Sequence, residues 1–141
     1  MTVRVFAGWD FTRTDMQSDW IRAGYTRGVP MGGELKPGGK GAPSFVISAL
    51  KDPQDGNLDR VQVIKGWVDA AGQSHEKVFD VVWSDMAKRP LTAGKVPAVG
   101  DTIDVATATY QNTIGAPTLA GSASMTMSSA ASIHSRTAGA M

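Results

Sequence analysis

The chain has 141 residues, of which 19% are charged and none is cysteine, and its formal net charge is +1. A single domain of this length buries roughly 68% of the surface that its unfolded chain exposes, so a real core can form. The near-neutral charge gives no field that favours nucleic acid or an anionic membrane. The absence of cysteine excludes disulfides, thiolate nucleophiles and Cys-ligated metals.

The first part of the chain predicts a strand, a helix and a long loop. The opening residues MTVRVFAGWDF indicate a strand and not a signal peptide, so the chain as written is expected to be soluble and cytoplasmic. A helix is expected near residues 15–23, because Thr14–Gln17 has the form of a capping box and Gly24 can end the helix. The Gly- and Pro-rich stretch 28–43 predicts a loop.

Residues 59–83 give the clearest strand signal. Two β-branched runs flank residues 70–73, where Gly72 can take the positive φ of a hairpin turn, so an antiparallel pair is expected. One face of the pair carries alternating apolar residues, and further apolar residues stand on the opposite face: Ile64, Val68, Val78 and Val82. We therefore expect both faces to be covered, by a second sheet or another domain.

Two more strands complete the predicted fold. SFVISALKD and TIDVATATY, residues 44–52 and 102–110, have strand character, and a second long loop spans residues 84–100. The expected fold class is mainly β with one short helix, an antiparallel sheet or partial β-sandwich built around the hairpin. About five or six strands are expected.

The glycine-rich loop lacks the form of a nucleotide site. A P-loop needs Gly, four residues, then Gly-Lys-Ser/Thr before a helix. Glu34 stands where the first glycine is required, Gly41 follows Lys40, and the next segment is β-like. No GxGxxG occurs either. The loop is therefore interpreted as structural.

The titratable residues form no recognisable catalytic or metal motif. His75 and His134 lack the spacings of a metal site such as HExxH or HxH. A solvated role for His75 is favoured over a ligand or general base, and Asp80 is expected to pair with Lys65 or Arg60. No serine lies in a GxSxG elbow. We predict no catalytic residue and no metal site in this chain.

Several stretches resemble, in the same order, the C-terminal part of the family called domain of unknown function 3604: RVFAGWDF, AGYTRGVPMGGEL, GAPSFVISALKDP, GNLDRVQVIKGWVDAAGQSHEKVFDVVWS and PAVGDTIDVATATYQNTIGA. The resemblance spans about residues 2–120, and its most distinctive part runs from Lys51 to Trp83. Full-length relatives are several times longer, are often exported to the periplasm, and are similar to metal-dependent phosphoesterases of the polymerase-and-histidinol-phosphatase superfamily.

The resemblance implies a noncatalytic role for this chain. In the relatives a divalent metal is held by motifs such as GDLHxHT and SDTH, upstream of the region matched, and neither motif occurs in this sequence. The chain would then be a β-rich fragment, truncated at both ends, that packs on and helps to shape the site of a catalytic domain it does not contain. In isolation it is expected to self-associate.

The last residues depart from the family pattern. Residues 1–120 are interpreted as the β-rich portion, and 121–141 as a divergent, flexible tail that lacks the apolar alternation of a strand. Deleting the tail is expected to leave stability unchanged. A frameshift is one origin for it, and a natural Ser/Ala-rich terminus is the other.

Two alternatives belong to different functional classes. One is a free-standing β-sandwich that binds a small ligand or carbohydrate through aromatic residues such as Trp9 and Trp67. The other is an autonomous enzyme that uses Asp10, His75 and Asp80. The residues considered as candidates for ligand binding are Trp9, Asp10, Met31, Gly32 and Gly33.

Overall fold

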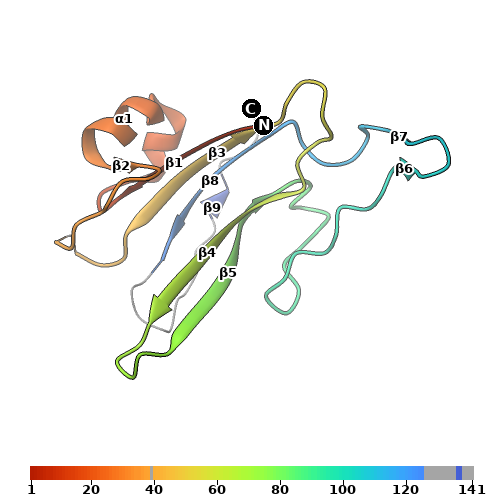
Figure 1. Ribbon diagram of the computed structural model, residues 1–141. Helices are drawn as coiled ribbons and strands as arrows, with labels where there is room; N and C mark the ends of the chain where they lie inside the picture. The colour runs from red at the N-terminus through yellow and green to blue at the C-terminus, as the bar shows by residue number, and fades with distance from the viewer. Residues whose placement is uncertain (39, 126–135, 138–141) are drawn as a thin grey trace.

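The computed structural model describes residues 1–38, 40–125 and 136–137. It confirms the expected class, since the elements are mainly antiparallel strands with one short α-helix (Figure 1). In chain order they are β1 (Thr2–Gly8), a 3₁₀ helix (Arg13–Gln17), α1 (Trp20–Arg27), β2 (Val29–Pro30), β3 (Ser44–Leu50), β4 (Arg60–Val68), β5 (Ser74–Trp83), β6 (Ile103–Asp104), β7 (Thr109–Tyr110), β8 (Thr118–Ser124) and β9 (Arg136–Thr137).

The main sheet has five strands in the order β2-β1-β3-β8-β9. β1 and β3 pair along their whole length, from Thr2 opposite Leu50 to Gly8 opposite Ser44, and β3 pairs with β8 in the same way. Because strand side chains alternate between faces, this register assigns each apolar residue to one side of the sheet. One face carries Phe6 and Val46, and the other carries Val5, Ala7, Phe45, Ile47 and Ala123.

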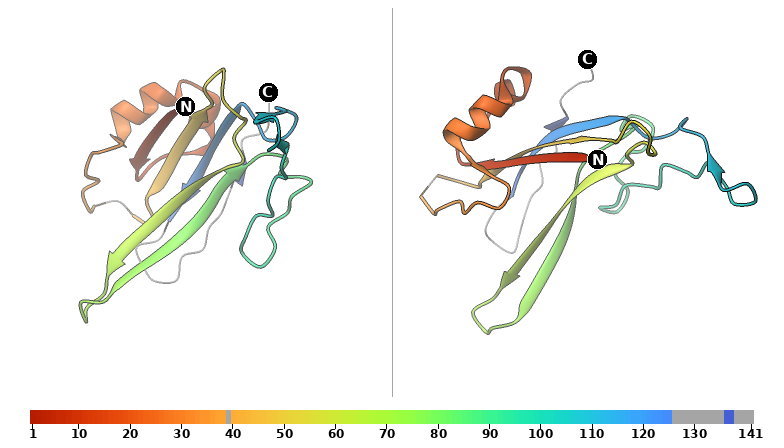
Figure 2. Two further views of the ribbon diagram at one scale, coloured as in Figure 1. Left: turned by 45° about the vertical axis from the view of Figure 1, so that its right-hand side comes forward. Right: turned by 45° about the horizontal axis from the view of Figure 1, so that its top comes forward.

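α1 covers the first of these faces (Figure 2). Phe6 is fully buried there and meets Trp20 and Tyr25 edge-on, at ring-centroid distances of 5.8 and 4.8 Å. Gly24 permits this contact, because a Cβ at that position would lie 2.4 Å from the Phe6 ring. Gly24 is therefore a packing residue inside α1, and the prediction that it ends the helix is wrong; Gly28 is the C-cap.

The expected helix at 15–23 is divided into two short helices, each with its own capping carboxylate. Asp15 Oδ2 accepts hydrogen bonds from the backbone N–H of Thr12 at 2.7 Å and from its hydroxyl at 2.9 Å, so the capping box begins two residues before the predicted one. Asp19 caps α1 by accepting from the N–H of Arg22 at 3.1 Å. Asp19 therefore begins a new helix at a position that the sequence pattern places in the middle of a single helix.

The predicted hairpin is confirmed. β4 and β5 pair from Arg60 opposite Trp83 to Val68 opposite Ser74. Gly72 has a φ of +79° in the turn, and Asp69 Oδ1 accepts hydrogen bonds from two backbone N–H groups of the same turn. The hairpin forms a two-stranded sheet of its own, and its tip projects away from the main sheet (Figure 2).

The core lies where the base of the hairpin crosses the second face of the main sheet. It is formed by buried residues of β3, β5 and β8 and by the residue after β8: Ile47, Phe79, Val81, Ala123 and Met125. On β8, Gly121 lets the hairpin come close, since a Cβ there would lie 3.1 Å from the Cβ of Val82. This contact joins the two sheets at one place.

The hairpin has one exposed apolar face. Ile64 and Val68 are each 65% exposed and Val78 is 47% exposed, whereas Val82 is 5% exposed at the base. The expectation that both faces are covered is therefore wrong within the described part of this chain. Only the base of the hairpin crosses the main sheet, so no described residue forms a layer over the outer face nearer the tip.

The loop over residues 84–100 is held by the buried side chain of Arg89. Its guanidinium forms an ion pair with Asp59 and donates hydrogen bonds to the carbonyls of Ser84 at 3.0 Å and Pro97 at 3.1 Å. The indole N–H of Trp83 donates to the Arg89 carbonyl at 2.8 Å. A charge buried with this many partners fixes the loop against the hairpin base.

The expected strand at 102–110 is instead a short hairpin. β6 and β7 occupy its two ends and pair with each other. Asp104 accepts hydrogen bonds from the backbone N–H groups of Ala106 at 3.0 Å and Thr107 at 3.4 Å, and Ala108 has a φ of +53°. The aspartate thus reverses the chain in the middle of an apparently continuous apolar pattern.

The start of the expected tail belongs to the main sheet. β8 continues through Ser124, across the predicted boundary at residue 120, and pairs with β3 on one side and β9 on the other. Ala123 and Met125 are buried in the core. The prediction that this segment lacks alternation is wrong for residues 121–125, while residues 126–135 and 138–141 lie outside the described part.

A chain ending at Ala120 is expected to unfold well below a chain ending at Met125. Losing a buried Met side chain costs about 2–5 kcal/mol, which corresponds to a fall of roughly 10 °C or more in the unfolding temperature. Circular dichroism during heating measures both midpoints. Equal midpoints would show that residues 121–125 contribute nothing to the core.

Candidate functional site

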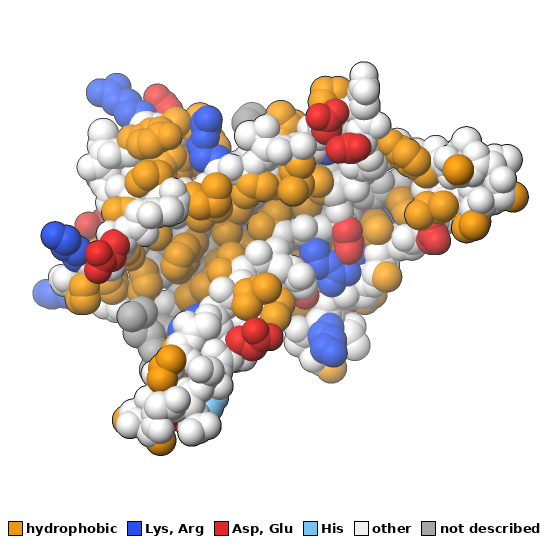
Figure 3. Space-filling model, in the orientation of Figure 1, with side chains coloured by type: hydrophobic (Ala, Val, Ile, Leu, Met, Phe, Trp, Pro, Cys, Tyr) orange, Lys and Arg blue, Asp and Glu red, His pale blue; other side chains and the backbone are white. Residues whose placement is uncertain are grey.

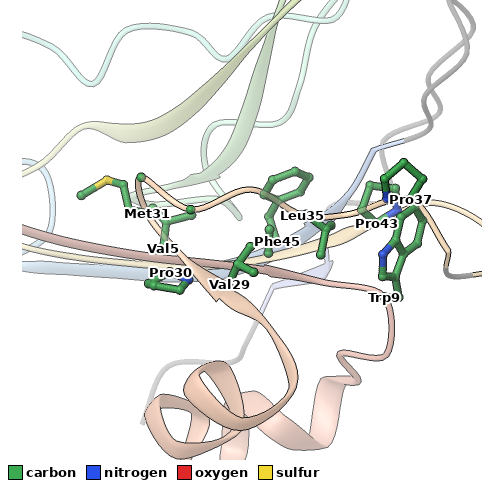
Figure 4. Close-up of a pocket in the computed structure, with 12 residues that line it drawn as sticks. Val5, Trp9, Val29, Pro30, Met31, Leu35, Pro37, Pro43 and Phe45 are labelled. Carbon is green, nitrogen blue, oxygen red and sulfur yellow. The ribbon is translucent and has the colours of Figure 1, made fainter.

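An apolar pocket with a volume of about 370 Å³ lies between the main sheet and the loop that follows β2 (Figure 4). Its floor is the second face of the sheet, beyond the point where the hairpin crosses. Its walls come from the end of β1, from β2 and from the loop. The pocket is lined by Val5, Ala7, Trp9, Val29, Pro30, Met31, Gly32, Gly33, Leu35, Pro37, Pro43 and Phe45.

Local backbone contacts fold the loop over the sheet. β2 pairs with β1, and the N–H of Met31 then donates to the Val5 carbonyl at 3.0 Å. Gly32, with a φ of +86°, reverses the chain where an L-residue would be strained. Further along, the carbonyl of Lys36 accepts a hydrogen bond from the indole N–H of Trp9 at 3.1 Å, which ties the loop to the end of β1.

The structure brings four of the five candidate ligand-binding residues together. Trp9, Met31, Gly32 and Gly33 line the pocket, whereas Asp10 does not line it and uses its carbonyl to accept a hydrogen bond from Arg27 at 3.1 Å. Binding of a ligand by these four remains a prediction.

Sequence reasoning did not include the rest of the lining. The missed residues are strand residues that share a face, prolines of β2 and the loop, and the loop residue Leu35. The prolines alone have a visible signal, since they are concentrated in this part of the sequence. The full set of missed residues is Val5, Ala7, Val29, Pro30, Leu35, Pro37, Pro43 and Phe45.

The second aromatic candidate lies elsewhere. Trp67 belongs to β4 and not to a loop, it is absent from the pocket lining, and it stacks on His75 at a ring-centroid distance of 5.4 Å. The Lys65 ammonium lies 4.9 Å from the centre of the Trp67 ring. His75, in turn, contacts the turn aspartate, with its Nε2 2.7 Å from Asp69 Oδ2. These contacts form a small cluster at the tip of the hairpin.

The environment of Asp80 is structural. Its carboxylate accepts hydrogen bonds from the Gln62 amide at 2.7 Å and the Val96 N–H at 3.2 Å, and Arg60 lies 3.8 Å away. The predicted pairing with Arg60 is thus confirmed. Asp80 anchors the loop over 84–100 to the hairpin, together with Arg89.

Within residues 1–38, 40–125 and 136–137, no three His, Asp or Glu side chains form a group that could hold a metal ion. The side chains described there do not fit the divalent metal that the resemblance implies for full-length relatives. His134 lies outside the described residues. No helix in the described part of the chain is long and apolar enough to cross a membrane.

A model of the family described as protein of unknown function (DUF3604) matches residues 1–123. The matched region includes the pocket, the complete hairpin and β8 almost to its end. No curated protein and no solved structure matches the chain.

Replacing His75 by Ala is expected to raise the pKa of Asp69. The hydrogen bond from His75 is the main cause that holds this pKa below its ordinary value, followed by the N–H groups of Gln73 and Ala71. A lowered folded-state pKa stabilises the hairpin above the unfolded-state pKa, and this contribution is lost as the pH falls below about 4.

Carboxyl-carbon NMR during an acid titration measures this change. Asp104 is the matched control, because its lowered pKa is caused chiefly by the Thr107 side chain and should not respond to the substitution. An unchanged Asp69 pKa in the His75→Ala variant would mean that the imidazole has no role in the turn.

Proposed function

Because the chain belongs to the DUF3604 family, we propose that it serves as a noncatalytic, β-rich portion that packs on a phosphoesterase-like catalytic domain outside this chain and helps to shape that domain's site. The observation that carries the proposal is the exposed apolar face of the β4–β5 hairpin. A second domain can pack against this face and cover its apolar side chains.

Three aliphatic side chains lie on the hairpin's exposed face, together with Ser74 and Glu76. Ile64 and Val78 stand directly opposite each other in the β4–β5 register, and Val68 follows on the same face. Fully burying one such side chain contributes about 1.5–3 kcal/mol. A partner that covers all three therefore gains a substantial part of the free energy that a stable interface needs.

The shape of the molecule supports the same proposal. The hairpin extends past the main sheet as an arm, and hydrophobic side chains are visible on its surface (Figure 3). The arm is fixed at its base by the core and by Arg89, so its orientation is defined before a partner binds. A preorganised apolar surface loses little entropy on association.

The purified chain is expected to show no hydrolysis of p-nitrophenyl phosphate or bis(p-nitrophenyl) phosphate with manganese, zinc, calcium or magnesium. In the proposed arrangement the reacting groups belong to the other domain. The assay follows release of nitrophenolate. Metal-dependent turnover that survives repurification and disappears in Asp10→Ala or His75→Ala would overturn the proposal in favour of an autonomous enzyme.

The isolated chain is expected to self-associate through its exposed hairpin face. A variant combining Ile64→Asn and Val68→Thr should shift the chain toward monomer, because it removes apolar area from that face. Size-exclusion chromatography with light scattering over a range of concentrations measures the change. Val105→Asn is the control, since Val105 is 86% exposed but lies on the β6–β7 turn.

A wild-type chain that stays monomeric at high concentration would contradict this expectation. Equal association of the hairpin variant and the wild type would place the association surface elsewhere on the molecule.

A further inference from the structure

The apolar face of the main sheet extends beyond the hairpin that covers its centre. Ile47 and Ala123 are buried beneath β5, whereas Val5 and Phe45, on the same face, are only half-buried at the edge of the core. Past that edge the described chain covers the sheet only with the loop after β2. The pocket is thus a continuation of the core that this loop encloses without filling.

The lining offers almost no polar chemistry. None of its side chains carries a charge, a hydroxyl or an amide, and its single side-chain donor, the indole N–H of Trp9, is already bonded to the Lys36 carbonyl. A sugar hydroxyl or an ionic group placed here would lose its hydrogen bonds to water and gain no side-chain partner in return. The chemistry of the pocket therefore selects an uncharged, apolar group.

The pocket is held open by its own backbone. Three prolines, Pro30, Pro37 and Pro43, restrict the wall, and the N–H of Gly33 donates to the Pro30 carbonyl at 2.9 Å. Met31 is 68% exposed, and its thioether side chain can adapt to the shape of an occupant. A largely preformed, concave, apolar cavity of this volume suits a compact molecule more than a flat protein surface.

A second cavity of similar size shows the contrast. It has a volume of about 360 Å³ and lies near β6 and β7, where polar residues line it. Two asparagine side chains of this lining form hydrogen bonds with the protein backbone. Asn57 Nδ2 donates to the Ile114 carbonyl at 2.9 Å, and Asn112 Nδ2 donates to the Asp55 carbonyl at 3.0 Å. These groups fasten neighbouring loops together, so this cavity has a structural explanation that the apolar pocket lacks.

We propose that the pocket formed by β1, β2, the β2–β3 loop and β3 is a binding site for a small, uncharged molecule of aromatic or alicyclic character. Trp9 and Phe45 supply ring surfaces, and Val5, Ala7 and Val29 supply the aliphatic floor and wall. The occupant completes the apolar layer over the open end of the sheet. This role is separate from the packing of a partner domain on the hairpin.

Methyl NMR of methionine-labelled protein tests the proposal with indole and cyclohexanol as probes and glucose as the sugar comparison. The Met31 signal is expected to shift and saturate at millimolar indole or cyclohexanol, as small fragments bind weakly. The signal of Met86, in the loop after β5, should stay in place, and glucose should move neither signal. A Met31→Leu variant assigns the reporter.

Ala7→Leu is the variant that tests the pocket directly, because its larger apolar side chain fills part of the pocket without adding charge. It is expected to weaken indole binding at least tenfold, whereas Ile64→Asn on the hairpin should bind indole as the wild type does. Circular dichroism checks that each variant folds. Independently of any variant, nuclear Overhauser contacts in the wild-type protein should connect indole protons with the methyl groups of Val5, Val29 and Met31.

Several results would overturn the proposal: no saturable Met31 shift with either probe at millimolar concentration, equal indole binding by Ala7→Leu, contacts from indole to Ile64 or Val68 instead of the pocket, or a glucose shift as large as that of indole. Apart from indole contacts at Ile64 or Val68, these results do not bear on the partner domain, which concerns the hairpin face alone.

Discussion

The close approach of β5 to β8 at Gly121 is the contact on which the rest of the structure depends. A Cβ at this position would lie 3.1 Å from the Cβ of Val82, so any larger residue would move the hairpin away from the sheet by a few tenths of an ångström. The crossing buries Phe79 and Val81 and closes the core. Because the hairpin crosses at its base alone, the described residues leave its tip and one end of the sheet face uncovered. The exposed hairpin face and the apolar pocket are two results of the same geometry.

Local signals were sufficient for part of the fold. The hairpin could be predicted because alternating residues and a turn glycine act within a few positions of one another. The helix was misplaced because Thr12, Thr14 and Asp19 are all possible N-caps, and sequence alone does not decide among them. β8 was missed as a whole because its Gly, Ala and Ser residues have weak strand propensity. Its conformation is specified by β3 and by the hairpin above it, which are distant in sequence.

The candidate site was predictable to a similar extent. Trp9 and Met31 could be selected because a large side chain beside a glycine-rich loop is a common ligand contact, and both line the pocket. Asp10 follows Trp9 in the bend after β1 but does not line the pocket, and its carbonyl accepts a hydrogen bond from Arg27. Val5 and Phe45 could not be chosen from the sequence, since their role depends on where the hairpin ends its cover of the sheet. That boundary is a tertiary property.

Hydrogen exchange on the chain, alone and mixed with a purified phosphoesterase-like domain of the kind proposed as its partner, tests the proposed partnership most directly. The account predicts slower exchange in the mixture at the amides of Ile64 to Val68 and around Val78, with little change at α1. Unchanged exchange along the hairpin in the presence of a folded, active catalytic domain would contradict it, as would protection confined to α1.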